Sequence, residues 1–150
     1  MDDSLRELYQ EVILDHSRHP RHFGALPVHS HMAEGHNPLC GDRVKVFLQV
    51  DACGRIEDVS FEGRGCAISV ASASLMTELL KTRTIAEAER LMGGFLALVK
   101  GGDAASLDAS DRERLEVMAG VSAFPMRVKC ATLAWHAMKA ALEHEGRAKT

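Results

Sequence analysis

The sequence contains few aromatic residues and few prolines: one tryptophan, one tyrosine, five phenylalanines and four prolines in 150 residues. It also has no excess of basic charge, since 21 acidic residues outnumber 18 lysines and arginines and the formal net charge is -3. A polybasic surface for nucleic acid or for an anionic membrane is therefore not expected. With 46% hydrophobic residues, the chain can still bury a core, and its length predicts a single domain over residues 1–150.

Long apolar runs are also missing. Nowhere do about 18 apolar residues follow one another, so no membrane-spanning helix is expected. The first residues, MDDSLREL, lack the basic flank and apolar centre of a secretory signal, and we expect a cytoplasmic protein. Cysteines number only four. In a reducing compartment they are more often metal ligands, reactive thiols or buried residues than two disulfides.

The N-terminal part of the chain predicts one helix followed by a loop-rich segment. Ser4 and Glu7 form a capping-box pattern, and apolar residues then recur at helical spacing over about 5–18. Residues 23–38 are rich in proline, glycine and histidine. They leave room for one short strand at a sheet edge, around 28–34.

Two strands are predicted next. Apolar and polar residues alternate over 44–50, as in a strand with one buried face, and a second strand contains Val59 and Phe61. The four residues 51–54, DACG, form a turn between them, which predicts an antiparallel hairpin. Ile56 is out of phase with Val59 and indicates a bulge.

Helical periodicity resumes after the strands. Four further helices are predicted, over 68–80, 85–99, a short stretch after the loop 103–109, and 125–142. Thr84 with Glu87 opens the second of these, and Gly101 and Gly102 close it. Ser110 with Glu113 opens the short helix, which Gly120 ends, and Pro125 stands in the first turn of the last helix. The fold class is therefore α+β, a small antiparallel sheet packed against about five helices.

The segment NPLCGDR holds the first candidate site residues. Cys40 and Asp42 stand on either side of Gly41, and Arg43 follows. In extended backbone, residues two apart point to the same side, so the thiol and the carboxylate could address one point in space. Gly41 gives the backbone the freedom to adjust that approach.

Two other cysteines stand in comparable settings. Cys66 follows EGRG, including Arg64, at a predicted turn from strand to helix. Cys130 lies in the first turns of the last predicted helix, just after Arg127 and Lys129. Helix N-termini and basic neighbours both favour a thiolate over a thiol.

Three thiolates and one carboxylate are a suitable donor set for a four-coordinate zinc ion. The predicted ligands are Cys40, Asp42, Cys66 and Cys130, whereas Cys53 lies in the hairpin turn without such a setting. No CxxC pair is present, so the fold would have to assemble the site, and an oxygen ligand predicts lability. On residue types alone, buried cysteines acting as small hydrophobic side chains remain an equally weighted alternative.

Four segments carry a family resemblance: ELYQEVILDHSRHPRHFG, NPLCGDRVKV, FEGRGCAISVASASLMTELLK and GVSAFPMRVKCATLAWHAMKAAL. They resemble the NifU N-terminal, IscU and SufU family of iron-sulfur cluster assembly proteins over nearly the whole chain. Two features resemble the SufU branch. Lys129 stands where the scaffold branch has a histidine, and the segment between Cys66 and Cys130 is longer than in that branch.

The resemblance implies a SufE/NifU-like fold and a zinc-dependent sulfurtransferase. By motif match, Cys40, Asp42, Cys66 and Cys130 would bind zinc. Cys40 would accept persulfide sulfur from a SufS-type cysteine desulfurase and pass it to a downstream Suf scaffold or another acceptor. Arg127 would contact the persulfide anion or the partner.

Two other functions stay open. The chain could be a scaffold on which a [2Fe-2S] cluster forms on the same ligands, with iron or a transient cluster in place of zinc. Lys129 weakens that reading, because a protonated lysine is a poor metal ligand. The chain could also be a non-enzymatic, zinc-stabilised binding module. In the histidine-rich segment 16–36, a helix end and a solvated loop are favoured over a second metal site.

Overall fold

The structure is a computed structural model, and it describes residues 3–39, 41–146 and 148. Its elements follow in the order α1 (Asp3–Arg18), β1 (His31–Asn37), β2 (Asp42–Val50), β3 (Ile56–Arg64), α2 (Ala67–Leu80), α3 (Ile85–Val99), α4 (Ala109–Leu115), the 3-10 helix η1 (Glu116–Ala123) and α5 (Pro125–Leu142). The predicted α+β class, with strands between a first helix and a series of later helices, is confirmed.

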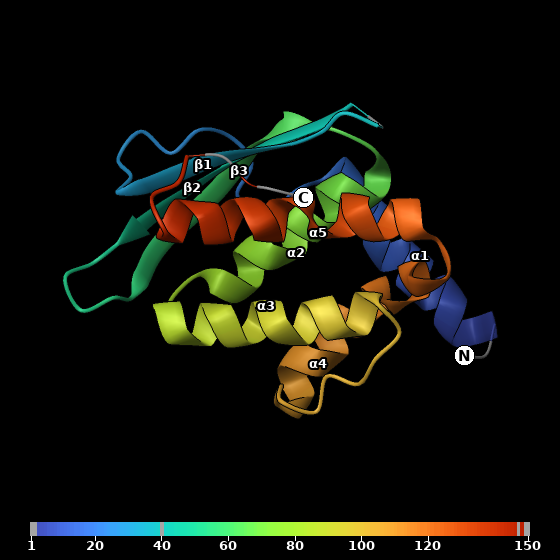
Figure 1. Ribbon diagram of the computed structural model, residues 1–150. Helices are drawn as coiled ribbons and strands as arrows, with labels where there is room; N and C mark the ends of the chain where they lie inside the picture. Colours follow the sequence, from blue (N-terminus) through green and yellow to red (C-terminus); the bar gives the residue numbers. More distant parts are fainter. Residues whose placement is uncertain (1–2, 40, 147, 149–150) are drawn as a thin grey trace.

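The helices gather on one side of a three-stranded antiparallel sheet. The strand order is β1-β2-β3. Helix α5 packs on β1 and β2, and α2 packs on β3 and on α5. Figure 1 shows α5 and α2 directly beneath the sheet, α3 and then α4 farther from it, and α1 to the side against α2. The core is continuous from the sheet through these helix layers.

Small residues, including the ASAS segment at 71–74, let α2 and α5 approach closely. Ala71 and Ala131 are fully buried. The Ser72 hydroxyl donates to the carbonyl of Ala131 at 2.5 Å and accepts the indole N–H of Trp135 at 3.2 Å. These contacts fix α5, and hence Cys130, relative to the start of α2.

Strand β1 lies three residues later than the predicted edge strand at 28–34. Gly35 lies inside the strand, just after the predicted end, and a Cβ atom there would stand 3.0 Å from Cδ1 of Leu133. The glycine therefore permits close packing of α5 on the sheet. The edge position itself is correct, because β1 is hydrogen-bonded to β2 alone within the sheet.

The predicted hairpin and bulge are both confirmed. Val50 pairs with Ile56 and Gln49 pairs with Asp58, which leaves Glu57 as an extra residue in β3. The 51–54 turn contains Gly54 at φ +82, a conformation that favours glycine.

The helix caps were predicted with mixed success. The capping box of Thr84 and Glu87 at α3 is confirmed, with both reciprocal hydrogen bonds present. Helix α1 begins at Asp3, so Ser4 lies inside it rather than before it. Ser110 is not the cap of α4, because the carboxylate of Asp108 accepts the N–H of Asp111 at 2.8 Å. Aspartate caps as well as serine, and here it stands two residues earlier.

The region after α4 also differs from the prediction. Gly120 does not end the helical structure there, because η1 runs from Glu116 to Ala123 without a break. Bidentate hydrogen bonds from Arg83 to the buried Asp111 connect α4 to the turn before α3. The hydrogen bonds to Asp111 raise the pKa of Arg83, so the guanidinium stays charged in this link.

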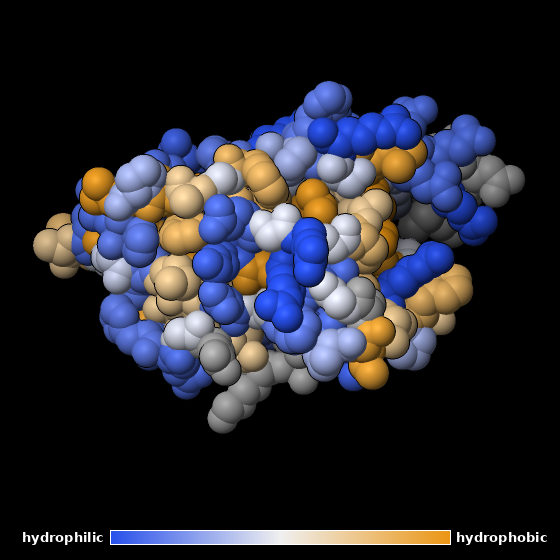
Figure 2. Space-filling view, turned by 90° about the horizontal axis from the view of Figure 1, so that it is seen from above, coloured by the Kyte–Doolittle hydropathy of each residue, from blue (hydrophilic) through white to orange (hydrophobic). Residues whose placement is uncertain are grey.

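Both outer edges of the sheet are covered by other parts of the chain. At β3, the N–H of Gly24 donates to Phe61 O and the N–H of Phe61 donates to His22 O. At β1, Glu34 exchanges hydrogen bonds with Gly146 and Ala148. Backbone groups paired in this way are not available for pairing with another chain. The sheet face turned away from the helices, seen in Figure 2, is a mosaic of hydrophilic and hydrophobic residues. None of the described helices is long and apolar enough to cross a bilayer.

Candidate metal centre

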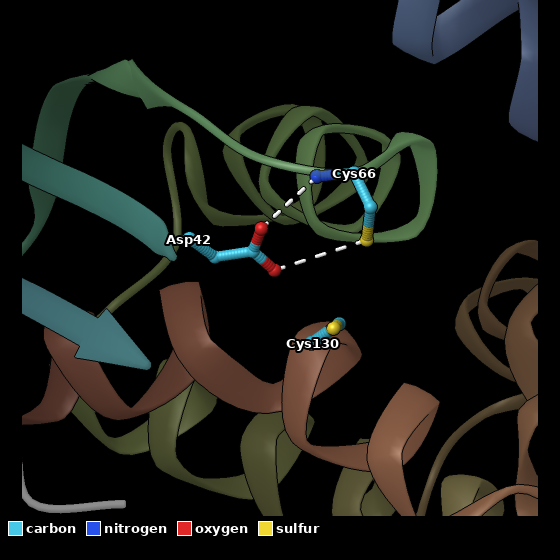
Figure 3. A group of neighbouring side chains, drawn as sticks. All are labelled: Asp42, Cys66 and Cys130. Atoms are coloured by element: carbon cyan, nitrogen blue, oxygen red, sulfur yellow. Dashed lines mark hydrogen bonds between the residues drawn. The ribbon is translucent and has the colours of Figure 1, made fainter. Parts of the chain in front are cut away.

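Three side chains from separate elements meet at one end of the sheet (Figure 3). Asp42 is the first residue of β2, Cys66 directly precedes α2, and Cys130 lies in the second turn of α5. Their ligand atoms all lie within 4.8 Å of one another. Within the described chain, this is the only such cluster of three or more His, Cys, Asp or Glu residues. The structure thus brings three of the four predicted ligands together.

Backbone amides hold the cluster in place. Asp42 is only 2% exposed, and its Oδ1 accepts the N–H of Cys66 at 3.1 Å. The Sγ of Cys66 donates to Oδ2 of Asp42 at 3.8 Å and accepts the N–H of Ser69 at 3.5 Å, as the N-cap of α2. Cys130 is buried, whereas Cys66 is exposed. The cluster therefore has one side in the protein interior and one side open to solvent.

Gly65 makes the approach of Asp42 to Cys66 sterically possible. A Cβ atom at this position would stand 2.7 Å from Oδ1 and 2.9 Å from Cγ of Asp42, and 3.1 Å from Oγ of Ser69. Atoms at such distances would have to move apart. The two-glycine approach to Cys66 predicted a turn here, and the structure adds that Gly65 leaves room for the carboxylate.

Cys40, the fourth predicted ligand, lies outside the described residues. The loop on either side of it is tied to Asn37, which is 3% exposed and stands opposite Asp42 in the strand register. Oδ1 of Asn37 accepts the N–H of Leu39 at 3.1 Å, and its carbonyl accepts the N–H of Gly41 at 2.8 Å. Asn37 therefore closes the loop that carries Cys40.

The role of Asn37 was missed in the sequence, although an Asn-Pro dipeptide is a known turn signal. Gly41 also differs from the expectation of extended backbone between Cys40 and Asp42. It has φ +73, in the left-handed region, and β2 begins only at Asp42. The chain turns at Gly41 instead of continuing as a strand, so the simple alternation argument for Cys40 and Asp42 does not hold.

The basic neighbours of the cysteines are distributed around the cluster rather than in it. Arg43 and Arg64 are exposed on the outer face of the sheet. The guanidinium of Arg127 lies over the exposed ring of Phe124, 4.5 Å from its centroid. Lys129 is exposed and lines a groove between α3 and α5 of about 430 Å³, together with Lys100.

The remaining candidates have other surroundings. His16 is buried, and its Nδ1 lies 2.7 Å from the hydroxyl of Ser74, while Nδ1 of His22 lies 3.0 Å from the hydroxyl of Thr77. His16 thus attaches the end of α1 to α2, and His22 attaches the segment after α1 to α2. Cys53 is exposed in the hairpin turn beyond the other end of β2.

The donor set fits zinc. One carboxylate and two sulfur atoms are preferred zinc ligands, and a tetrahedral site with bonds of about 2.1–2.3 Å separates its ligand atoms by roughly 3.5–3.8 Å. The three ligand atoms, within 4.8 Å of one another, are close to that spacing.

Comparison with known proteins gives concordant matches. The profile described as "NifU-like N terminal domain" matches residues 8–131. The chain is 39% identical over 142 residues to the zinc-dependent sulfurtransferase SufU of Bacillus subtilis, covering 95% of this chain and 94% of that protein. It is 37% identical over 147 residues to the iron-sulfur cluster assembly scaffold protein IscU of Streptococcus pyogenes, covering 97% and 89%.

A solved structure supports the fold assignment. It is the crystal structure of a candidate iron-sulfur cluster assembly scaffold protein for the SUF system from Fervidobacterium islandicum. The two structures align with a TM-score of 0.81 at 34% identity, over 91% of this chain and 98% of that one. The relatives therefore share one fold but carry two functional descriptions, sulfurtransferase and scaffold.

Proposed function

The chain belongs to the NifU-like N-terminal domain family of iron-sulfur cluster assembly proteins, and we propose that within it this protein is a zinc-dependent sulfurtransferase. It would take persulfide sulfur from a SufS-type cysteine desulfurase in the cytoplasm and pass it to a Suf scaffold or another acceptor. The observation that carries the proposal is the cluster of one carboxylate and two sulfur atoms, open to solvent on the side of Cys66.

The residues proposed to hold zinc are Asp42, Cys66 and Cys130, with Cys40 as the fourth ligand. Bound zinc would keep its sulfur ligands as thiolates and shield them from oxidation. Asp42 supplies the oxygen ligand, held by the N–H of Cys66. An oxygen among sulfur ligands makes the set less closed than an all-cysteine site, which suits a site that releases one ligand.

Cys40 is the proposed sulfur acceptor. Its thiolate attacks the terminal sulfur of the persulfide on the desulfurase, so that a new S–S bond forms on Cys40. The S–S bond of the donor breaks, and its electron pair leaves with the desulfurase cysteine as a thiolate. One persulfide and one thiolate exist before and after the step, so no external oxidant or reductant is needed. Leu39, next to Cys40, is 67% exposed, which is consistent with access for a partner.

Arg127 is proposed to contact the persulfide anion or the desulfurase. It is exposed, and the ring of Phe124 beneath it holds the guanidinium by a cation–π contact. Phe124 is 49% exposed and Met126 is 45% exposed. This start of α5 thus presents apolar surface with one fixed positive charge, as protein contacts often do.

Two features favour transfer over the scaffold function. Lys129, the residue before Cys130, is exposed and lines the groove with Lys100, and a protonated lysine is a poor metal ligand. The segment that resembles the SufU insertion forms α4 and η1, which pack on each other and on α3. Arg83 anchors this insertion through Asp111.

The second candidate function, a scaffold for a [2Fe-2S] cluster, is supported by the same ligand set and by the name of the Streptococcus relative. The visible spectrum of protein purified without oxygen separates the two. A colourless, zinc-loaded protein supports transfer. A brown protein whose cluster survives gel filtration supports the scaffold.

The test of transfer itself uses a purified SufS-type desulfurase with free cysteine. We expect about one zinc per chain and a faster release of sulfide by reductant when the protein is present. Cys40→Ala should abolish this stimulation, and Cys53→Ala, which alters an exposed cysteine in the hairpin turn at the far end of β2, should leave it intact. Full stimulation by Cys40→Ala would disprove the transfer role and favour a zinc-stabilised binding module.

A further inference from the structure

Three basic side chains form a row across the sheet. His36 of β1 pairs with Arg43 of β2, and Arg43 pairs with Arg64 of β3. All three are exposed. The residue after His36, Asn37, and the residue before Arg43, Asp42, are buried and face inward. The row therefore lies on the outer face, the one viewed in Figure 2, with its side chains about 5 Å apart at Cβ.

This row is energetically unfavourable for the isolated protein. Like charges directly opposite one another in a ladder destabilise the sheet, and the two arginines are permanently charged. Among the described residues, none of these three side chains has a hydrogen bond or an ion pair. In the next row on the same face, opposite charges stand side by side. Lys45 lies between Glu34 and Glu62 and forms an ion pair with Glu34 at 3.5 Å.

The row lies directly beside the proposed zinc site. Arg43 follows Asp42, Arg64 is two residues before Cys66, and His36 precedes the loop closed by Asn37. A hollow of about 370 Å³ opens next to the row, lined by His36 and Arg43 together with Phe23, which is 54% exposed. The paired row of Glu34, Lys45 and Glu62 also lines it, so Lys45 is a matched control within the same hollow. Unpaired positive charge and exposed aromatic surface thus adjoin the point where sulfur would arrive.

We propose that the row of His36, Arg43 and Arg64 docks an acidic segment of the sulfur-donating protein, with an apolar side chain of that segment over Phe23. The inference rests on the proposed function, because it assigns the surface to the sulfur donor. Carboxylates of the partner would supply the counter-charge that this chain does not provide, and such pairing speeds association. A nucleic acid is not favoured, because acidic Glu34 and Glu62 adjoin the row and interrupt any basic track.

The test measures stimulation of a purified SufS-type desulfurase over a range of concentrations of this chain, at low and at moderate salt. In the double variant Arg43→Gln/Arg64→Gln, the half-saturating concentration should rise about three- to tenfold at low salt, with the maximal rate close to that of the unaltered chain. The half-saturating concentration of the unaltered chain should rise with salt, and that of the variant should rise less. The control is Lys45→Gln, on the same face but in the ion-paired row. It should change the half-saturating concentration little.

The two levels of the proposal fail in different ways. If the unaltered chain does not stimulate the desulfurase, the transfer function itself is wrong. If it stimulates, but the double variant retains the same half-saturating concentration and salt dependence, the docking row is wrong.

Zinc content and circular dichroism are measured for each variant. Should the double variant lose zinc, Arg43→Gln alone and the salt dependence of the unaltered chain decide the question by the same criteria. Binding of single-stranded DNA that depends on the row would also overturn the proposal.

Discussion

Gly65 controls how closely Asp42 can approach Cys66. Gly65→Ala would place a methyl group 2.7 Å from Oδ1 of the buried carboxylate, which must then move away from its amide donor. Since residues that orient metal ligands affect metal affinity about 10- to 100-fold, we expect a loss of zinc affinity in that range. Competition with a chromophoric chelator measures it.

The matched control is Gly93→Ala in α3, where a Cβ atom meets nothing within 4 Å. Alanine is a better helix former than glycine, so this variant should keep its zinc affinity and gain up to about 1 kcal/mol in stability. Equal zinc affinities for the two variants would show that Gly65 has no role in positioning Asp42.

At the scale of single residues, the sequence predicted which types of side chain could form the site but not what holds them. Asp42, Cys66 and Cys130 come together, as their residue types and local settings indicated. The supporting residues Asn37 and Gly65 were not predicted in these roles. Their function depends on a strand register and on a side chain distant in sequence, neither of which is visible before the chain is folded.

Among the secondary-structure elements, α4 offers a direct comparison of two candidate caps. Asp108→Ala removes the side-chain acceptor for the N–H of Asp111 and should cost about 1 kcal/mol of the free energy of unfolding. Ser110→Ala alters the residue that the sequence pattern favoured, but it lies inside the helix and should change stability by no more than about 0.5 kcal/mol. Urea denaturation of both variants checks this, and a larger loss for Ser110→Ala would contradict the assigned cap.

The attachment of α1 to α2 predicts a pH dependence of stability. Burial, assisted by Arg21, holds the pKa of His16 below its ordinary value, while Glu78 and Asp15 act in the opposite direction. The unfolded chain therefore binds more protons at this position than the folded chain as the pH falls below about 6.5. The contribution of His16 to the free energy of unfolding should be complete above that pH. It should decline toward pH 5, by at most about 1.4 kcal/mol per pH unit for one proton.

Urea denaturation of the zinc-free protein at pH 7.5 and pH 5.5, pH values chosen to bracket about 6.5, tests this without interference from metal ligands. His16→Gln should lose less stability on acidification than the parent chain. The decline should not vanish, because burial also lowers the pKa values of His31 and His136. His19→Gln changes an exposed histidine and should behave like the parent. If His16→Gln shows the same pH dependence as the parent, the buried histidine is not the cause.

Helix caps and strand irregularities were predicted correctly where a short sequence pattern determines them. Predictions were less accurate where a tertiary contact determines the structure. The capping box at Thr84 and the bulge near Ile56 follow from short sequence patterns, and both are present. The predicted bounds of β1 were three residues too early, and Gly35, which lies inside the strand, allows the close packing of Leu133. Such roles of glycine are set by tertiary contacts.

On the scale of the whole molecule, the core and the proposed zinc site are separable. The buried cluster extends from the sheet through α2, α3 and α5 and consists of apolar side chains such as Trp135, Phe95 and Phe61. Removal of zinc by a chelator should therefore leave the helical circular dichroism intact and lower the melting temperature. Free zinc at about 100 times its dissociation constant stabilises by roughly 2.7 kcal/mol, so re-addition should restore the melting temperature. Loss of the helical signal on chelation would show that the fold depends on the metal.

The central claim is that Cys40 receives the sulfur while Asp42, Cys66 and Cys130 keep the metal. Peptide mapping by mass spectrometry tests it most directly. The protein is mixed with a SufS-type desulfurase and free cysteine, and its thiols are alkylated without reductant. We predict one additional sulfur atom on the peptide containing Cys40 and none on those containing Cys53, Cys66 or Cys130. Additional sulfur on Cys66 or Cys130 but not on Cys40, or on none of the four cysteines, would contradict the account.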